Sequence, residues 1–92
     1  MTLIILESSW EEPISDEEFD KLAAQVTPCL DERQATWLTS YMATDRRRRI
    51  CVFHARDAES VRQAYRLSGV KFDRVWAAEQ IEDDEDYEED DD

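Results

Sequence analysis

The side chains in this sequence that could take part in catalysis or ligand binding are those of one histidine, two cysteines and a run of arginines. As the single histidine, His54 could transfer protons or bind a metal ion, the two roles that suit imidazole at neutral pH. A lone histidine in a strand can equally be structural. Cys51 lies in an apolar segment, where a free thiol is typically buried. Cys29 and Cys51 form no CxxC motif, so no thioredoxin-type or zinc site is predicted.

Arg46, Arg47, Arg48 and Arg49 are consecutive and separate two apolar segments. Guanidinium groups match phosphate and carboxylate, so the run could be an anion site. It could also be a solvated turn whose charges discourage edge-to-edge pairing of strands. A third hypothesis is a salt-sensitive contact with the acidic end of the chain, in the same subunit or its neighbour.

Acidic residues at the end of the chain dominate the net charge of −13. Without the ten acids of residues 82–92, 14 acidic and 11 basic residues remain, a net charge of −3. We therefore predict one domain over residues 1–81 and a disordered acidic tail over 82–92. The tail could aid solubility or dock a basic protein partner, and the acidity argues against nucleic-acid binding.

The longest apolar run, Leu3 to Leu6, is too short to cross a membrane. No basic residues precede it, as they would in a secretory signal. Two cysteines without such a signal suggest free thiols in the cytoplasm.

Apolar periodicity predicts a buried strand over 2–8 and a helix that begins after Ser15. Ser15 and Glu18 have the spacing of a capping box, and an apolar stripe continues to Leu30. Pro28 removes a backbone hydrogen bond, so we expect either a kinked helix to about residue 33, which we favour, or an early stop.

The second half of the chain predicts a hairpin, a helix and a final strand. Segments 36–43 and 48–55 are rich in β-branched and aromatic residues and are separated by a short polar link. The helix over 58–68 follows an N-cap aspartate and ends at Gly69, the only glycine. The last strand is expected over 72–81.

This order predicts an α+β fold, the ferredoxin-like βαββαβ sandwich. It has a four-stranded antiparallel sheet in the order 4-1-3-2, with both helices on one face. The strands are apolar on both faces, so the helix-free face also needs cover. We expect a homodimer in which two sheets pack face to face, a dimeric α+β barrel.

The register of the hairpin decides whether a ligand pocket exists. A two-residue turn at 45–46 places Trp37 opposite His54, Thr39 opposite Val52 and Tyr41 opposite Ile50. Trp37, Thr39, Tyr41 and His54 would then share one face as a small-ligand pocket. A three-residue turn would break this group.

Residues 48–61, RRICVFHARDAESV, carry a resemblance to a known family. The matching positions over most of residues 1–81 are Trp37, Leu38, Ser40, Tyr41, Cys51, Ala55, Asp57, Ala58, Glu59, Val61, Ala64, Tyr65, Gly69 and Phe72 to Trp76. They resemble a bacterial family of small proteins described as nickel-binding, with a dimeric ferredoxin-like fold. The resemblance implies nickel as a cofactor, with His54 as the metal ligand. Tyr65 stands where some family members have histidine.

Three functions follow as hypotheses. The first is a non-enzymatic homodimer that binds a metal ion, a small ligand or a partner protein, with Trp37, Tyr41, His54 and Tyr65 as ligand-binding residues. The second is a cofactor-independent enzyme of the dimeric α+β barrel type, such as a monooxygenase or isomerase, that uses His54, Tyr41 and Tyr65. The third is an adaptor whose acidic tail docks a basic partner.

Overall fold

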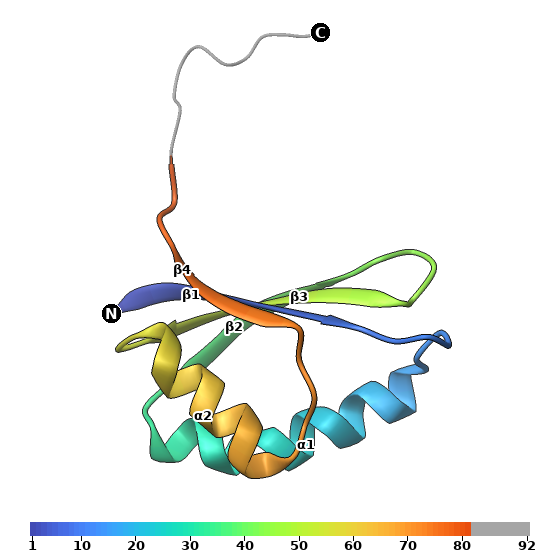
Figure 1. Cartoon of the computed structure of the whole chain (residues 1–92), viewed down its shortest axis with the longest axis horizontal. Coiled ribbons are helices and arrows are strands. Elements are labelled where there is room, and N and C mark those ends of the chain that lie inside the picture. Colours follow the sequence, from blue (N-terminus) through green and yellow to red (C-terminus); the bar gives the residue numbers. More distant parts are fainter. Residues whose placement is uncertain (82–92) are drawn as a thin grey trace, which may run out of the picture.

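The computed structural model describes residues 1–81, which form one sheet with two helices on one face (Figure 1). The elements are β1 (Thr2–Ser9), α1 (Asp16–Glu32), β2 (Thr36–Met42), β3 (Arg48–Ala55), α2 (Ala58–Ser68) and β4 (Arg74–Ala78). The strands pair antiparallel in the order β2-β3-β1-β4. The predicted ferredoxin-like architecture and strand order are confirmed. The predicted tail, residues 82–92, lies outside the described residues.

Strand β1 lies between β3 and β4, with one face toward the helices and the other away from them. Successive side chains of a strand point to opposite faces. Ile4, Leu6 and Ser8 are therefore buried beneath the helices, whereas Leu3 and Ile5 lie on the opposite, helix-free face, where they are partly exposed. We call this helix-free face the open face.

Helix α1 begins at the predicted capping box. Ser15 Oγ accepts a hydrogen bond from Glu18 N at 3.1 Å, and the Glu18 carboxylate accepts one from Ser15 N at 3.0 Å. The helix continues through Pro28 to Glu32, so the alternative of an early stop is wrong. It continues because Val26 and Leu30 bury the apolar stripe on both sides of the proline. Neither helix described here is long and apolar enough to cross a membrane.

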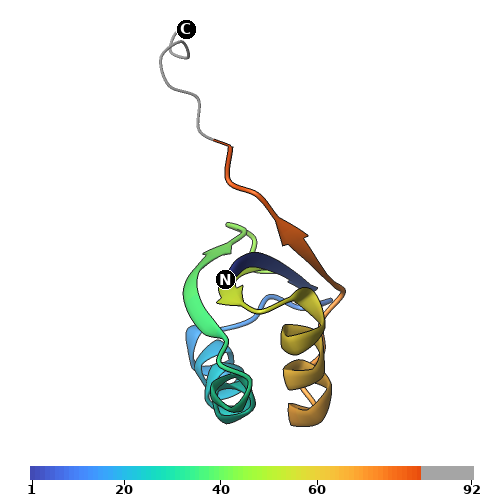
Figure 2. The same cartoon turned by 90° about the vertical axis from the view of Figure 1, so that its left-hand side faces the viewer.

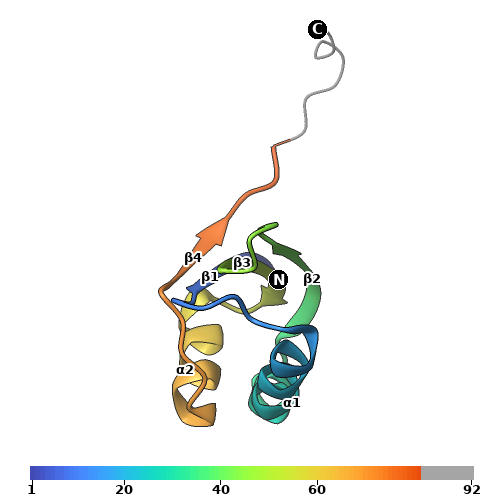
Figure 3. The same ribbon diagram turned by 90° about the vertical axis from the view of Figure 1, so that its right-hand side faces the viewer.

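Helix α2 has the predicted bounds and the predicted caps. The Asp57 carboxylate accepts hydrogen bonds from Ser60 N at 2.9 Å and Ser60 Oγ at 2.8 Å. Gly69 ends the helix with φ at +80°, a left-handed conformation that favours glycine. The two helices lie side by side beneath the sheet (Figure 2, Figure 3). Gln25 Nε2 links them by donating a hydrogen bond to the Ser68 carbonyl at 2.6 Å.

Strand β4 is shorter than the predicted 72–81. At its start, Phe72 turns inward and packs against Tyr65, with ring centroids 6.0 Å apart. At its end, Ala78 pairs with Leu3, the second residue of β1. Strand β4 therefore ends close to the start of its partner strand.

The hairpin confirms part of the predicted register. Tyr41 pairs with Ile50 and Thr39 with Val52, as expected. The prediction for Trp37 is wrong, because an irregularity between Trp37 and Thr39 pairs Trp37 with Phe53 instead of His54. The extra residue of a bulge reverses the face to which the next side chain points, so Trp37 joins the helix side of the sheet.

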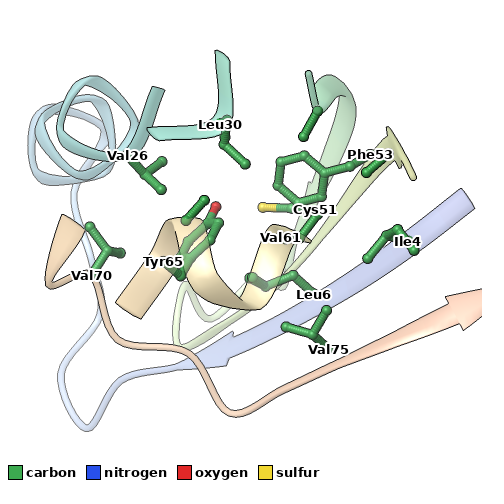
Figure 4. Close-up of a cluster of buried hydrophobic side chains, with 13 residues drawn as sticks. Ile4, Leu6, Val26, Leu30, Cys51, Phe53, Val61, Tyr65, Val70 and Val75 are labelled. Atoms are coloured by element: carbon green, nitrogen blue, oxygen red, sulfur yellow. The ribbon is translucent and has the colours of Figure 1, made fainter. Parts of the chain in front are cut away.

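The core fills the space between sheet and helices (Figure 4). Its largest fully buried side chains are Tyr65, Phe53, Ile4, Leu6, Val26, Val61 and Cys51. The ring of Phe53 lies between those of Trp37 and Tyr65, at centroid distances of 5.2 and 6.2 Å. Strands β2 and β3 and helix α2 are therefore joined by one row of aromatic rings.

The cap of α2 makes the stability of the fold depend on pH. The hydrogen bonds from the Ser60 hydroxyl and backbone lower the pKa of the Asp57 carboxyl. A lowered pKa in the folded state stabilises the protein above the unfolded-state pKa, and this contribution is lost as the pH falls through the folded-state pKa. Asp57→Ser keeps a capping oxygen but has no carboxylate to titrate. Below about pH 4, the free energy of unfolding should therefore fall more steeply in the wild type than in Asp57→Ser.

Urea denaturation at stepped pH measures this difference. Asp20→Ser, which removes an exposed carboxylate from the second turn of α1, is the matched control and should follow the wild-type curve. Parallel curves for wild type and Asp57→Ser would contradict the assigned role of the cap.

Candidate functional site

The sheet separates the four predicted ligand-binding residues into two pairs. Trp37 and Tyr65 lie on the helix side, where both contact the ring of Phe53. Tyr41 and His54 lie in phase with Ile50 on the open face. The predicted group of Trp37, Tyr41 and His54 on one face is therefore wrong. Tyr41, His54 and Tyr65, the trio considered for a cofactor-independent enzyme, do not share a site either.

The open face carries an apolar surface that spans all four strands. Across the sheet, Thr39, Val52, Ile5 and Trp76 form one row, and Tyr41, Ile50, Glu7 and Arg74 form the next. Large apolar side chains in these rows remain exposed: Ile50 by 41%, Trp76 by 44% and Tyr41 by 65%. No helix covers this side of the sheet (Figure 1). A contiguous exposed apolar surface of this kind marks an interaction site.

His54 lies at one end of the open face, between Leu3 on β1 and Thr36 on β2. It is exposed, so its imidazole is accessible to a metal ion. Within residues 1–81, no group of three or more His, Cys, Asp or Glu side chains is placed to hold a metal. Residues 1–81 of one protomer therefore supply the His54 imidazole without a group of three metal-binding side chains around it.

The arginine run does not act as one unit. Arg46 is anchored: its Nε donates to the Ile14 carbonyl at 2.7 Å and its Nη2 to the Asp16 carboxylate. Arg47 and Arg48 are exposed, and neither forms an ion pair with another residue of the described 81. Arg49 points to the helix side and is only 2% exposed. Arg47 and Arg48 thus remain available for the predicted anion or tail contact, which the described residues do not test.

Arg49 is enclosed by aromatic rings. Its Cζ lies 4.4 Å from the ring centroid of Phe19, 5.5 Å from that of Trp10 and 5.8 Å from that of Trp37. Each such cation–π contact is worth about 0.5–2 kcal/mol. The guanidinium therefore connects β3 to β2, to the start of α1 and to the segment that follows β1.

The buried guanidinium is not fully hydrogen-bonded. Arg49 Nε and Nη1, Ser8 Oγ and Tyr65 Oη are buried without a hydrogen-bond partner among residues 1–81. Ser8 and Arg49 are cross-strand neighbours on the helix side of the sheet. A buried charge without a counter-ion costs several kcal/mol, of order 3–5 when a partner is missing. Sequence analysis missed Ser8, although it lies in phase with the buried Ile4 and Leu6.

Cys51 lies beside this cluster. Its sulfur accepts a hydrogen bond from Ser40 Oγ at 3.3 Å, and the Tyr65 hydroxyl points toward it (Figure 4). Burial raises the pKa of the Cys51 thiol, and the positive charge of Arg49 offsets part of this effect. Burial also raises the pKa of the Tyr65 hydroxyl. Both groups are therefore protonated at neutral pH and can donate hydrogen bonds.

A surface hollow of about 390 Å³ adjoins the cluster, between the end of α2 and the start of β4. Its lining includes Tyr65, Ser9, Arg66, Lys71, Phe72 and Asp73. Ser9 Oγ donates a hydrogen bond to the Asp73 carboxylate at 2.7 Å, so this carboxylate is already engaged. The remaining charges at the mouth of the hollow, Arg66 and Lys71, are positive.

Comparison with known proteins gives two matches. The model of a family described as nickel responsive protein SCO4226-like matches residues 4–77. The crystal structure of SCO4226 from Streptomyces coelicolor A3(2) is similar to this chain, with a TM-score of 0.76 and 10% sequence identity over 87% of this chain and 99% of that one. At this identity the structural similarity shows the fold alone. No curated protein matches the chain.

The buried position of Cys51 should make the two thiols chemically distinct. Because the thiolate is the reactive form and burial raises the pKa of Cys51, iodoacetamide at about pH 8 should modify only the partly buried Cys29 in the native protein. Both thiols should react in guanidinium chloride. Intact mass measures the number of adducts, and native Cys29→Ala should gain none. Rapid labelling of native Cys29→Ala would show that Cys51 is accessible.

Proposed function

Because the chain belongs to the family of SCO4226-like nickel responsive proteins, we propose that it is a non-catalytic binding protein with a nickel-related role, and that it acts as a homodimer. The open face of the sheet carries this proposal. It exposes Ile50, Trp76 and Tyr41 on the side that the helices leave uncovered.

A second copy of the same sheet suits this surface. The central row of the open face consists of Thr39, Val52, Ile5 and Trp76, without a charged side chain. Burial of apolar surface stabilises by about 25 cal/mol per Å². In a two-fold assembly the same patch serves both subunits, so one apolar face is covered by another and no further partner is required.

The proposed dimer would also affect how the protein binds nickel. Nickel in proteins is bound by imidazole and carboxylate ligands, and His54 is the single imidazole of the chain. Two open faces in contact place two copies of His54 in one assembly. The proposed role for His54 is therefore that of a nickel ligand whose site is completed by the dimer.

A charge placed in the open face should break the dimer. Ile50→Lys puts an ammonium group in the apolar patch, where burial is costly, and the exposed site should tolerate it in the monomer. We expect the wild type to elute at twice the chain mass of 10.9 kDa. The variant should dissociate with a dissociation constant raised at least about tenfold, which corresponds to about 1.4 kcal/mol. Size-exclusion chromatography with light scattering measures both masses.

Leu67→Lys is the matched control, since Leu67 is an equally large apolar side chain that is 67% exposed on α2, away from the open face. It should remain dimeric. A wild-type protein that is monomeric at micromolar concentration would refute the proposed assembly.

The nickel role is tested by calorimetric titration of nickel into the metal-free full chain and into His54→Ala. We expect a nickel-binding component in the wild type that disappears in the variant, because the acidic residues 82–92 bind weakly and equally in both proteins. Zinc and copper titrations show the selectivity of the site. Identical isotherms for wild type and variant would remove His54 from the nickel role.

A further inference from the structure

The buried cluster on the helix side lacks an acceptor. A guanidinium can only donate hydrogen bonds: Nε carries one N–H and Nη1 carries two. In Arg49 neither nitrogen has an acceptor within residues 1–81. The hydroxyls of Ser8 and Tyr65 are also unpartnered and can donate. The hydroxyl oxygens could also accept, but none of these groups carries a negative charge. An oxygen that carries negative charge would both accept from these donors and balance the guanidinium.

The aromatic rings around Arg49 leave this need unmet. Phe19, Trp10 and Trp37 contact the guanidinium through their ring faces and supply no hydrogen-bond acceptor. No carboxylate of residues 1–81 forms an ion pair with Arg49. A water molecule could accept a hydrogen bond here but could not neutralise the charge.

The hollow between the end of α2 and the start of β4 provides an approach. Tyr65 lines the hollow and carries one of the unpartnered hydroxyls, whereas Arg49 and Ser8 do not line it. Arg49 lies near enough for its positive charge to oppose the rise in the pKa of the Tyr65 hydroxyl. Arg66 and Lys71 contribute two positive charges at the mouth and Asp73 one negative charge, so the lining has a net charge of +1. In a chain with a net charge of −13, this local excess of positive charge favours the entry of an anion.

We propose that Arg49, Ser8 and Tyr65 bind a small organic carboxylate between the sheet and the helices. One negative charge matches the one guanidinium of the cluster, and the two oxygens of a carboxylate can accept from the guanidinium and a hydroxyl together. The apolar surroundings, Phe72 and Cys51 among them, favour a ligand that is small and carries one charge. This site lies on the opposite side of the sheet from His54, so it is independent of the nickel role.

The test uses acetate as the probe and the full chain as the protein. At constant ionic strength, with sodium chloride replaced stepwise by sodium acetate, acetate should raise the unfolding temperature, and above the dissociation constant the rise should follow the logarithm of the acetate concentration. It should also shift the NMR signal of the Arg49 Nε–H group. Arg49→Met should abolish the response, and Arg47→Met, which removes an exposed arginine of the same hairpin, should retain it.

Tyr65→Phe provides a second variant that changes only a hydroxyl, and it carries the test where Arg49→Met does not fold. It should weaken acetate binding at least about tenfold, the effect of losing one hydrogen bond to a charged group. A wild-type protein that does not respond to acetate, or variants at Arg49 or Tyr65 that respond as the wild type does, would overturn the proposal. His54→Ala and Ile50→Lys should keep the acetate response, so failure of the nickel or dimer proposals is measured separately.

Discussion

The alternation of side chains along β1 and β3 is the constraint on which the rest of this structure depends. Both strands are central in the sheet, so each side chain must face either the helices or the open face. Leu3 and Ile5 make the open face apolar, while Ile4 and Leu6 build the core. The sheet therefore separates two surfaces, and residues that are neighbours in sequence, such as Val52 and Phe53, lie on different ones. A site built from the side chains of these two strands within one protomer therefore lies on one side of the sheet.

The same alternation explains why the fold was predictable and the buried cluster was not. The helical and strand spacings of apolar residues identify the helices and strands from local sequence alone. Ser15, Asp57 and Gly69 mark ends of the helices without knowledge of tertiary contacts. The length of β4 depends instead on how far it pairs with β1. The side of the sheet on which Trp37 lies depends on a bulge in β2. These are properties of pairing, and no local pattern in β2 or β4 states them.

For the cluster, one signal was present in the sequence. Ser8 and Arg49 occupy inward positions in the alternation, in phase with Leu6 and Cys51. Arg49 appeared instead as the last member of a charged run, and that run suggested a solvated turn. Because side chains alternate along β3, neighbouring arginines of the run lie on opposite faces of the sheet. Arg48 faces solvent, whereas Arg49 lies beneath aromatic rings. A charged residue in phase with core positions is the sequence feature to note, since burial of an arginine requires compensation.

The two faces of the sheet also limit which side chains of one protomer could bind the same nickel ion. By the resemblance, Tyr65 stands at a position where a histidine is expected in some family members, and it lies on the helix side, against Phe53 and Phe72. A histidine at that position would be separated from His54 by the sheet, so the two could not bind one metal ion within a protomer. Within residues 1–81 His54 belongs to no group of three metal-binding side chains, so the proposed homodimer would help by bringing a second His54 into the same assembly. The interior of this chain holds the unpartnered groups of Tyr65 and Arg49, and the positive charge of Arg49 favours an anion there over a cation.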